Sequence, residues 1–324
     1  MDDAVILATS REMCLRKLSV LCQYCQEFGM IINEKKTKFL VINGEKCDRE
    51  DLLVENTRVA YTDRYIYLGA WFTHSDKMDD VLTLHEGQSE AIVNKFAIFC
   101  TANSQMPYIC KKKVFDAAVI SALLYSSESW LTNNMKSIEK QYNKLIKCLL
   151  GVRKNTSINL CMLEAGIPPL SNVIFKKRRT FLLSRRDRMD IDESFTLIFD
   201  MCKNHSTPGY RFLSNTVDVN PTLDPLANIV DYVRGKAPTA TKLNTYLTEL
   251  NSALNVHDIY LTTKYIPDCY RECLTRVRLM SHNLRVETGR WSRTPTPLRT
   301  CCCDDVSLHT QQHVLMSCTI SEDC

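Results

Sequence analysis

Hydrophobic residues early in the chain follow a helical spacing. Apolar side chains recur every three or four positions between Cys14 and Phe28, which predicts a helix of about five turns that ends at Gly29. Residues 9–12 read Thr-Ser-Arg-Glu, which has the spacing of a capping box, so they are expected to start this helix. An amphipathic helix with one buried face is therefore predicted here.

Strand patterns follow this helix. Residues 39–42 form a short apolar run that ends at an Asn-Gly turn. Residues 54–60 and 65–72 are rich in β-branched and aromatic side chains, so we predict that they pair as two strands joined around residues 62–64. A small sheet is the expected structure of this part of the chain.

From Met78 onward the hydrophobic spacing becomes helical for more than a hundred residues. The pattern predicts helices over 91–100, 114–125 and 138–150, and Pro169 is expected to begin a further helix. A helical bundle is therefore expected after the sheet. Its predicted breaks are Pro107, the pair Asn133 and Asn134, and Gly151.

Residues 190–266 carry the weakest pattern. Pro-Gly, Asn-Pro and Asp-Pro dipeptides interrupt them, and only residues 241–254 predict a short amphipathic helix. This segment is interpreted as a connector without chemistry.

The composition is that of a folded protein. Of the 324 residues, 45% are hydrophobic and 24% are charged, with a net charge of +4. This mild positive charge permits nucleic-acid binding but supports it only where basic residues cluster. No apolar run reaches the roughly 20 residues of a membrane span, and no N-terminal signal pattern is present. We therefore expect an intracellular protein of the nucleus or cytoplasm, without membrane contact.

Seven basic residues within thirteen positions form the strongest positive cluster, interrupted by one acid, Asp187. A helix so loaded would repel itself unless an anion lay along it, and the phosphates of a nucleic-acid duplex fit that role. Apolar residues between the basic ones would bury the other side of the helix. A solvated surface helix is the alternative. The basic residues are Lys176, Lys177, Arg178, Arg179, Arg185, Arg186 and Arg188.

The sixteen cysteines divide into two groups. Most are spaced singly and are interpreted as reduced core residues. Near residue 300, Cys301, Cys303, His313 and Cys318 supply three thiols and one imidazole, which suffice for a closed tetrahedral Zn²⁺ site. The Cys-x-Cys spacing is tighter than usual, and Cys302 is an alternative to either neighbour. Unligated thiols are the alternative to a metal site.

Three stretches early in the chain resemble palm motifs of the reverse transcriptases of non-LTR retrotransposons. Asp2 and Asp3, followed by an apolar run, are similar to the Asp-Asp box, whose usual aromatic residue would precede Met1. Residues 29–37 are similar to the Gly-x-x-x-Asn and Lys-Thr motif, and residues 67–69 match the Tyr-Leu-Gly hairpin. The order of these motifs strengthens a resemblance that each alone would support weakly.

Later stretches resemble downstream landmarks of the same enzymes. Residues 121–130 match a Leu-Leu-Tyr-x-x-Glu-x-Trp signature, although Ser126 replaces a usual glycine, and residues 163–170 match the next landmark. An Arg-Val-Glu-Thr-Gly-Arg-Trp sequence within 283–291 precedes the cysteines, as in the terminal zinc-knuckle-like module of these proteins. Gln312 stands where an acid is frequent.

The resemblance implies an α+β fold in which a small antiparallel β palm remnant precedes a mostly α-helical thumb and connector and a C-terminal zinc-knuckle-like module. Tyr125 and Trp130 are expected to be core anchors rather than base-stacking residues. The implied divisions are a partial palm at 1–76, a helical thumb-like domain at 77–190, a connector at 191–266, and a helical region with the Cys/His module at 267–324.

The resemblance also implies functional residues. Asp2 and Asp3 would hold catalytic Mg²⁺ together with a third aspartate from an upstream strand, and the alternative is a frayed, solvated terminus. RNA and DNA are the implied partners. The residues that would bind them at the palm, unless they are only a solvated loop and packed strand residues, are Lys35, Lys36, Lys38, Tyr67 and Gly69.

The function that this resemblance implies is that of a truncated RNA-directed DNA polymerase. The third aspartate, the fingers and the upstream nucleotide-binding motif are absent from these 324 residues, so the chain is expected to be inactive alone. A non-catalytic nucleic-acid-binding protein derived from a mobile element is the alternative. A zinc-stabilised helical interaction protein without a nucleic-acid role is a third hypothesis.

We expect the purified 324-residue chain to incorporate no nucleotide in a primer-extension assay with Mg²⁺. Two carboxylates without the rest of the palm cannot position a metal pair for phosphoryl transfer. Robust template-dependent extension by this chain would contradict the expectation.

Overall fold

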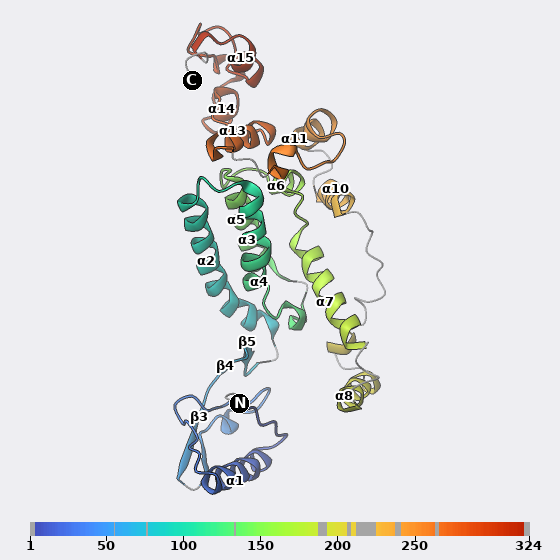
Figure 1. The fold of residues 1–324 in the computed structure, drawn as a ribbon. Helices are drawn as coiled ribbons and strands as arrows, with labels where there is room; N and C mark the ends of the chain where they lie inside the picture. The colour runs from blue at the N-terminus through green and yellow to red at the C-terminus, as the bar shows by residue number, and fades with distance from the viewer. Residues whose placement is uncertain are drawn as a thin grey trace. The chain divides into compact units, whose positions relative to one another are not determined.

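The computed structural model is a mixed α+β structure that is mostly helical (Figure 1). It divides into two compact units, of which unit 1 comprises Met1–Gln88 with Tyr125–Ile138, and unit 2 comprises Ser89–Leu124 with Glu139–Cys324. Each unit is described separately. The structure describes residues 4–54, 56–75, 77–132, 134–186, 193–205, 209–211, 225–236, 241–262 and 266–320.

Unit 1 contains the predicted first helix, α1 (Arg11–Glu27). Its N-cap is Ser10, whose hydroxyl accepts a hydrogen bond from the backbone of Met13, so the cap lies one residue later than the Thr-x-x-Glu spacing suggested. The helix ends before Gly29, which has a φ of 66° and takes the left-handed conformation that terminates many helices. Its buried side packs on the first sheet of this unit.

The first sheet consists of three short strands in the order β1, β3, β2. The expectation of a purely antiparallel sheet was wrong, because β1 pairs parallel to β3 while β2 pairs antiparallel to it. Between β1 and β2 the chain turns through a short 3-10 helix, and Arg11 donates hydrogen bonds to three carbonyls of this connection. The elements are β1 (Lys38–Phe39), η1 (Lys46–Asp48), β2 (Leu52–Val54) and β3 (Thr57–Tyr61).

A separate hairpin follows, formed by β4 (Arg64–Tyr67) and β5 (Ala70–Thr73). The prediction of one strand over 65–72, paired with residues 54–60, was therefore wrong, because β4 pairs with β5 and β3 pairs with β1 and β2. Leu68 and Gly69 have φ angles of 48° and 81°, and two successive residues with positive φ match the two-residue turn that suits the twist of a hairpin. The Tyr-Leu-Gly sequence thus lies at a turn.

Trp130 is a core residue of unit 1, as the sequence predicted. Its side chain is buried and its ring lies 5.0 Å from that of His85, measured between ring centroids. Burial lowers the pKa of His85. Tyr125 was also expected in the core, but it is 52% exposed and packs on the hairpin turn instead.

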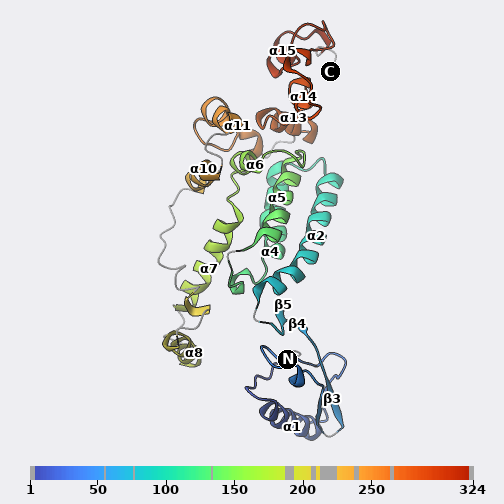
Figure 2. The same cartoon turned by 180° about the vertical axis from the view of Figure 1, so that it is seen from behind.

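Unit 2 is a helical assembly, and α4 and α5 lie side by side in both views of it (Figures 1 and 2). The predicted helices at 91–100, 114–125 and 138–150 are confirmed, although a π-helical turn and a separate helix divide the second of them. The boundaries between the units fall within α2, after α4 and within α5. The elements are α2 (Met78–Ala102), α3 (Tyr108–Val114), η2 (Phe115–Val119), α4 (Ile120–Leu123), η3 (Ser127–Ser129, in unit 1), α5 (Lys136–Leu150), α6 (Ile158–Ala165) and α7 (Leu170–Arg186).

The segment expected to be a connector contains more helix than its sequence predicted. The helix predicted over 241–254 is shorter, because it passes into a π-helical turn that ends at Leu250, and the side chain of Asn251 then accepts a bond from the backbone of Asn255. The elements are α8 (Glu193–Asn204), α10 (Pro225–Lys236), α11 (Thr241–Thr245), η4 (Tyr246–Leu250), α12 (Asp258–Leu261), α13 (Asp268–Arg278), α14 (Arg285–Trp291), η5 (Thr296–Leu298) and α15 (Gln311–Met316).

Among the described helices, none alone has the length and hydrophobicity of a membrane span. Together α6 and the part of α7 up to Ser184 reach those values, but a bend of 53° separates them. Most of α6 is buried inside unit 2.

Two carboxylates, buried Glu164 and largely buried Asp268, join α13 and its neighbours to the rest of unit 2. Asp268 accepts bonds from Lys111 and Arg271, and both cations are almost fully buried, with 2% and 3% of their side chains exposed. Glu164 accepts bonds from Tyr246 at 2.5 Å and from two further side chains, Tyr260 and Arg278. These groups stabilise the fold because each buried charge has a partner.

We expect Asp268→Asn to lower the free energy of unfolding by about 3–5 kcal/mol, because it leaves the buried Lys111 ammonium without its counter-charge. Chemical denaturation followed by circular dichroism would measure the change. The matched control is Asp116→Asn, which breaks the surface pair with Lys112 and should cost less than about 0.5 kcal/mol. Equal losses in both variants would contradict this expectation.

Candidate metal centre

Two of the candidate ligands lie on the cysteine loop, which we define as residues 300–308. Thr300 and Leu308 form an isolated antiparallel bridge at its base, and the backbone of Cys301 donates to Ser307 at 2.7 Å. Inside the loop, Asp304 accepts bonds from the backbone amides of Val306 and Ser307. A hydrogen bond with the Ser307 side chain, followed by these backbone bonds, holds the pKa of Asp304 down to about 2. The turn is therefore formed locally and presents two cysteines on a short rigid loop.

The other two candidate ligands are His313, within α15, and Cys318, two residues after the end of that helix. Thr310 caps the helix, since its hydroxyl accepts a bond from the backbone of His313. The side chain of Gln311 donates to the carbonyl of Val277 and so attaches α15 to α13. Cys318 follows the helix and is buried.

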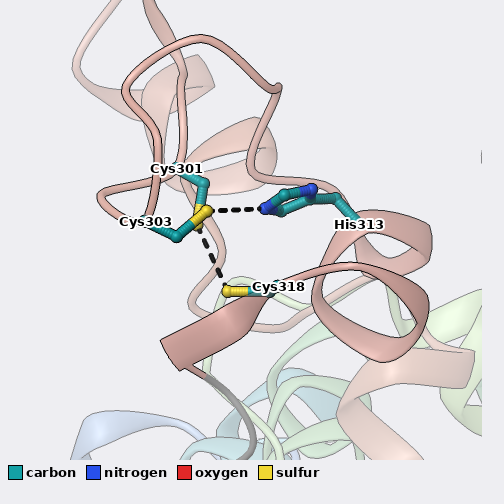
Figure 3. A group of neighbouring side chains, drawn as sticks. All are labelled: Cys301, Cys303, His313 and Cys318. Carbon is teal, nitrogen blue, oxygen red and sulfur yellow. Dashed lines mark hydrogen bonds between the residues drawn. The ribbon is translucent and has the colours of Figure 1, made fainter.

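The four side chains point toward one another (Figure 3). One ligand atom from each of Cys301, Cys303, His313 and Cys318 lies within 4.8 Å of all the others. Cys302 is exposed and does not belong to this group. The set predicted from the sequence is therefore the set that the fold brings together.

The distances fit a tetrahedral zinc ion. Zinc bonds of about 2.3 Å to sulfur and 2.0 Å to nitrogen would separate two sulfurs by about 3.8 Å and a sulfur from a nitrogen by about 3.5 Å. The Sγ atoms of Cys301 and Cys318 are 3.7 Å apart, and Cys303 Sγ is 3.1 Å from His313 Nε2. The group could hold Zn²⁺ with a small expansion of the second pair.

The Cys303 thiol is a poor acid without a cation. Desolvation, followed by hydrogen bonds to Cys301 and Cys318, raises the pKa of Cys303 to about 12. A divalent cation favours the thiolates and displaces their protons, so binding of metal and loss of protons are coupled. Four protein ligands leave no open position, which is typical of a structural zinc site.

The region around the candidate site has little hydrophobic core of its own. Several apolar side chains near the ligands are exposed, including Val306, Leu315 and Met316. A segment of this size without a buried core generally needs a metal or disulfides to hold one structure. The ligand group supplies such a link between the cysteine loop and α15.

The Arg-Val-Glu-Thr-Gly-Arg-Trp stretch anchors the cysteine loop. Arg285 donates to the carbonyl of Thr300, and Arg299 donates to the carbonyl of Val286 at 2.9 Å. A Cβ added at Gly289 would lie 2.6 Å from the side chain of Arg299, so only glycine leaves room for that arginine. The sequence did not reveal this role for Arg299.

The helix that carries this stretch is itself attached to α11. Glu287 accepts a bond from Lys242 at 2.5 Å and forms a longer pair with Arg290. Lys242 also donates to the carbonyl of Met280. Polar contacts thus run continuously from α11 through α14 to the cysteine loop.

Helix α7 does not expose its basic residues uniformly. Lys176 is exposed, whereas Lys177 donates a hydrogen bond to the carbonyl of Leu124. Arg178 is only 5% exposed, and desolvation lowers its pKa to about 10. Arg179 is half-buried. The buried position of Arg178 makes it a packing residue of α7 rather than a surface cation.

Several predicted site residues lie outside the part of the chain that the structure describes. Asp2, Asp3 and Arg188 belong to this group. Arg185 and Arg186 lie at the end of α7, but their side chains are outside the description. The predicted Mg²⁺ site therefore stays a prediction.

The predicted palm lysines lie in unit 1. Lys35, Lys36 and Lys38 are all exposed at and before the start of β1, and the hydroxyl of Tyr65 donates to the carbonyl of Lys36. Tyr67 is half-buried in β4. Their predicted contact with nucleic acid stays a prediction.

A contact between two of the motifs was not predicted. Tyr125 donates from its hydroxyl to the carbonyl of Leu68 at 2.7 Å, and a Cβ added at Gly69 would lie 2.7 Å from the Tyr125 ring. The glycine is therefore needed both for its φ angle and for this close approach. In the sequence, the order of the Tyr-Leu-Gly motif and the later Leu-Leu-Tyr-x-x-Glu-x-Trp signature was the one signal that could have indicated this contact.

Comparison with known proteins gives one relative. Over 162 residues the chain is 30% identical to an uncharacterized transposon-derived protein of Caenorhabditis elegans. The alignment covers 47% of this chain and 55% of the relative, so the chain spans about half the relative's length. No protein-family model matches the chain. No solved structure matches it. The similarity suggests a mobile-element origin.

We expect the chain to bind one equivalent of Zn²⁺ and Cys318→Ser to lose it, because the serine hydroxyl is a poor zinc ligand. Metal analysis after dialysis would measure the zinc content, and Co²⁺ substitution would report tetrahedral thiolate ligation. The apparent affinity should rise with pH, since the thiols release protons when they bind. The control Cys302→Ser should keep the metal. Equal loss in both variants would contradict the ligand assignment.

Proposed function

We propose that this chain is part of a reverse transcriptase of the non-LTR retrotransposon type, and that its helical unit binds nucleic acid with a zinc-held C-terminal module. The observation that carries the proposal is the convergence of Cys301, Cys303, His313 and Cys318, which follow the other motifs in the order that the resemblance requires. The similarity to a transposon-derived protein supports the same origin.

In this proposal the metal has a structural role. A closed set of three thiolates and one imidazole holds Zn²⁺ firmly and offers no position for a substrate. The ion would keep the cysteine loop and α15 together, while Gln311 and Arg285 attach them to α13 and α14. The module would thus present a fixed surface to a nucleic acid.

The polymerase part of the proposal rests on the motifs of unit 1. Asp2 and Asp3 would bind Mg²⁺ with a further aspartate, as two-metal phosphoryl transfer requires. The exposed lysines before and in β1 would contact phosphates. Tyr67 and Gly69, in the β4–β5 hairpin, would contact the primer strand.

A non-catalytic nucleic-acid-binding protein derived from a mobile element is the second candidate. One observation favours it: the metal group and the basic helix α7 both belong to unit 2, which excludes Asp2 and Asp3. Binding by unit 2 therefore does not require a working palm. Both candidate functions include nucleic-acid binding. They differ in whether the chain is part of a working polymerase.

We expect the zinc-loaded chain to bind an RNA or DNA duplex with an affinity that falls steeply with salt. Neutralising Lys176, Arg185 and Arg186 together should reduce the slope of log affinity against log salt by up to about three, since each lost phosphate contact removes about one. Anisotropy titrations at several salt concentrations would measure this. Arg178 is left intact because it is buried.

The matched control for this test is Lys95→Ala, at an exposed lysine of α2. Its effect on affinity and on the salt slope should be small. Binding that ignores both salt and the α7 substitutions would refute the proposed nucleic-acid role of this helix.

A further inference from the structure

A half-exposed tryptophan ends α14. Trp291 is 48% exposed, and the guanidinium carbon of Arg153 lies 4.7 Å from its ring centroid. Arg153 also donates to the carbonyl of His282, which helps to hold its side chain beside the ring. The indole of Trp291 thus makes a cation–π contact with Arg153 while about half of the residue's surface stays exposed to solvent.

The two segments that meet at this contact are rich in basic residues and lack acids. Residues 140–163 contain five Lys or Arg and no Asp or Glu, and residues 288–303 contain three Arg and no Asp or Glu. This is a strong local imbalance, because the whole chain is nearly balanced, with 41 basic and 37 acidic residues. The basic residues are Lys140, Lys144, Lys147, Arg153, Lys154, Arg290, Arg293 and Arg299.

Two acids that contact these segments are already paired. Glu287 binds Lys242 at 2.5 Å and Arg290 at 3.4 Å, and Glu272 binds Arg276 at 3.0 Å. Within the described part of the chain, Arg290 is the one member of the eight basic residues that forms an ion pair, and the acids that flank the segments are Glu139, Glu164, Asp304 and Asp305.

Two further cations lie next to this contact in sequence, Lys154 after Arg153 and Arg293 two residues after Trp291. Lys154 and Arg293 are exposed, and neither forms an ion pair within the described part of the chain. Arg290 keeps 55% of its side chain exposed despite its contact with Glu287. An anionic partner at Trp291 would meet Arg153 at the ring and further cations on the residues next to it in sequence.

We propose that the Trp291 surface, formed by Arg153, Lys154, Arg290, Trp291 and Arg293, binds single-stranded nucleic acid with an unpaired base stacked on the indole. The neighbouring basic side chains would pair with the phosphates of the strand. A base of a single strand has a free π face that can stack on an aromatic side chain, whereas a duplex hides that face. This inference rests on the proposed nucleic-acid function and specifies a strand type and a site for it.

The site differs from the other candidate surfaces of unit 2. Trp291 is not a member of the metal group, and it lies on α14 rather than on α7. Its substitution can therefore be separated experimentally from loss of zinc and from loss of the α7 contacts.

The test measures binding of the zinc-loaded full chain to a short labelled single strand and to the same strand with abasic sites. Trp291→Ala should weaken binding to the normal strand about 5- to 100-fold, the range found when a stacking aromatic is removed. Binding to the abasic strand should change little, since it has no base to stack. Trp291→Phe should restore most of the affinity for the normal strand.

Controls separate stacking from a loss of structure. Each variant should keep its zinc, and Tyr270→Ala, at a 69% exposed aromatic of α13, should leave binding unchanged. Arg293→Gln should lower the salt slope by about one while retaining the preference for the normal over the abasic strand.

The outcomes distinguish this inference from the function on which it rests. If the chain binds nucleic acid but Trp291→Ala has no effect, or weakens binding to both strands equally, this inference fails and the proposed function stands. The same holds if the chain binds duplex alone. If it binds neither single strand nor duplex, both fail.

Discussion

Unit 2 depends on carboxylates that are buried together with their cations. Asp268 forms ion pairs with Lys111 of α3 and Arg271 of α13. Glu164 of α6 forms an ion pair with Arg278 and accepts hydrogen bonds from two tyrosine hydroxyls. These partners lie up to 157 residues apart in the sequence. Burial makes each charge costly when it is alone, so the contacts demand one arrangement of the helices. Hydrophobic packing alone would be less selective.

Helix α13 links this interior to the C-terminal region. It contributes Arg271 and Arg278 to the buried network, and the carbonyl of Val277 on the same helix accepts the side chain of Gln311. Two further hydrogen bonds attach the cysteine loop to α14: Arg285 donates to the carbonyl of Thr300, and Arg299 donates to the carbonyl of Val286. Because this region has little core of its own, the chain combines such polar contacts with a ligand group suited to a metal.

The two proposed nucleic-acid surfaces of unit 2 would recognise different features. An exposed lysine on α7 can contact phosphate anywhere along a backbone, which favours affinity without sequence preference. An open indole face beside arginines would favour unpaired bases. A polymerase that copies a single-stranded template into a duplex needs both kinds of contact. The proposed function would place both kinds of contact in one unit.

Local patterns in the sequence determined the helices around 11–27, 91–100 and 138–150, the ligand set Cys301, Cys303, His313 and Cys318, and the buried position of Trp130. The helices and the ligand set follow from spacing along the chain, because helix periodicity and closely spaced ligands are short-range properties. The burial of Trp130 followed only from the tendency of large aromatic residues to be buried, and the same tendency was wrong for Tyr125. The tertiary structure alone decided the parallel pairing of β1, the burial of Arg178, the approach of Tyr125 to Gly69, and the meeting of Arg153 with Trp291. Those features join residues far apart in sequence, or depend on which side of a helix faces the interior, and a local pattern does not encode them.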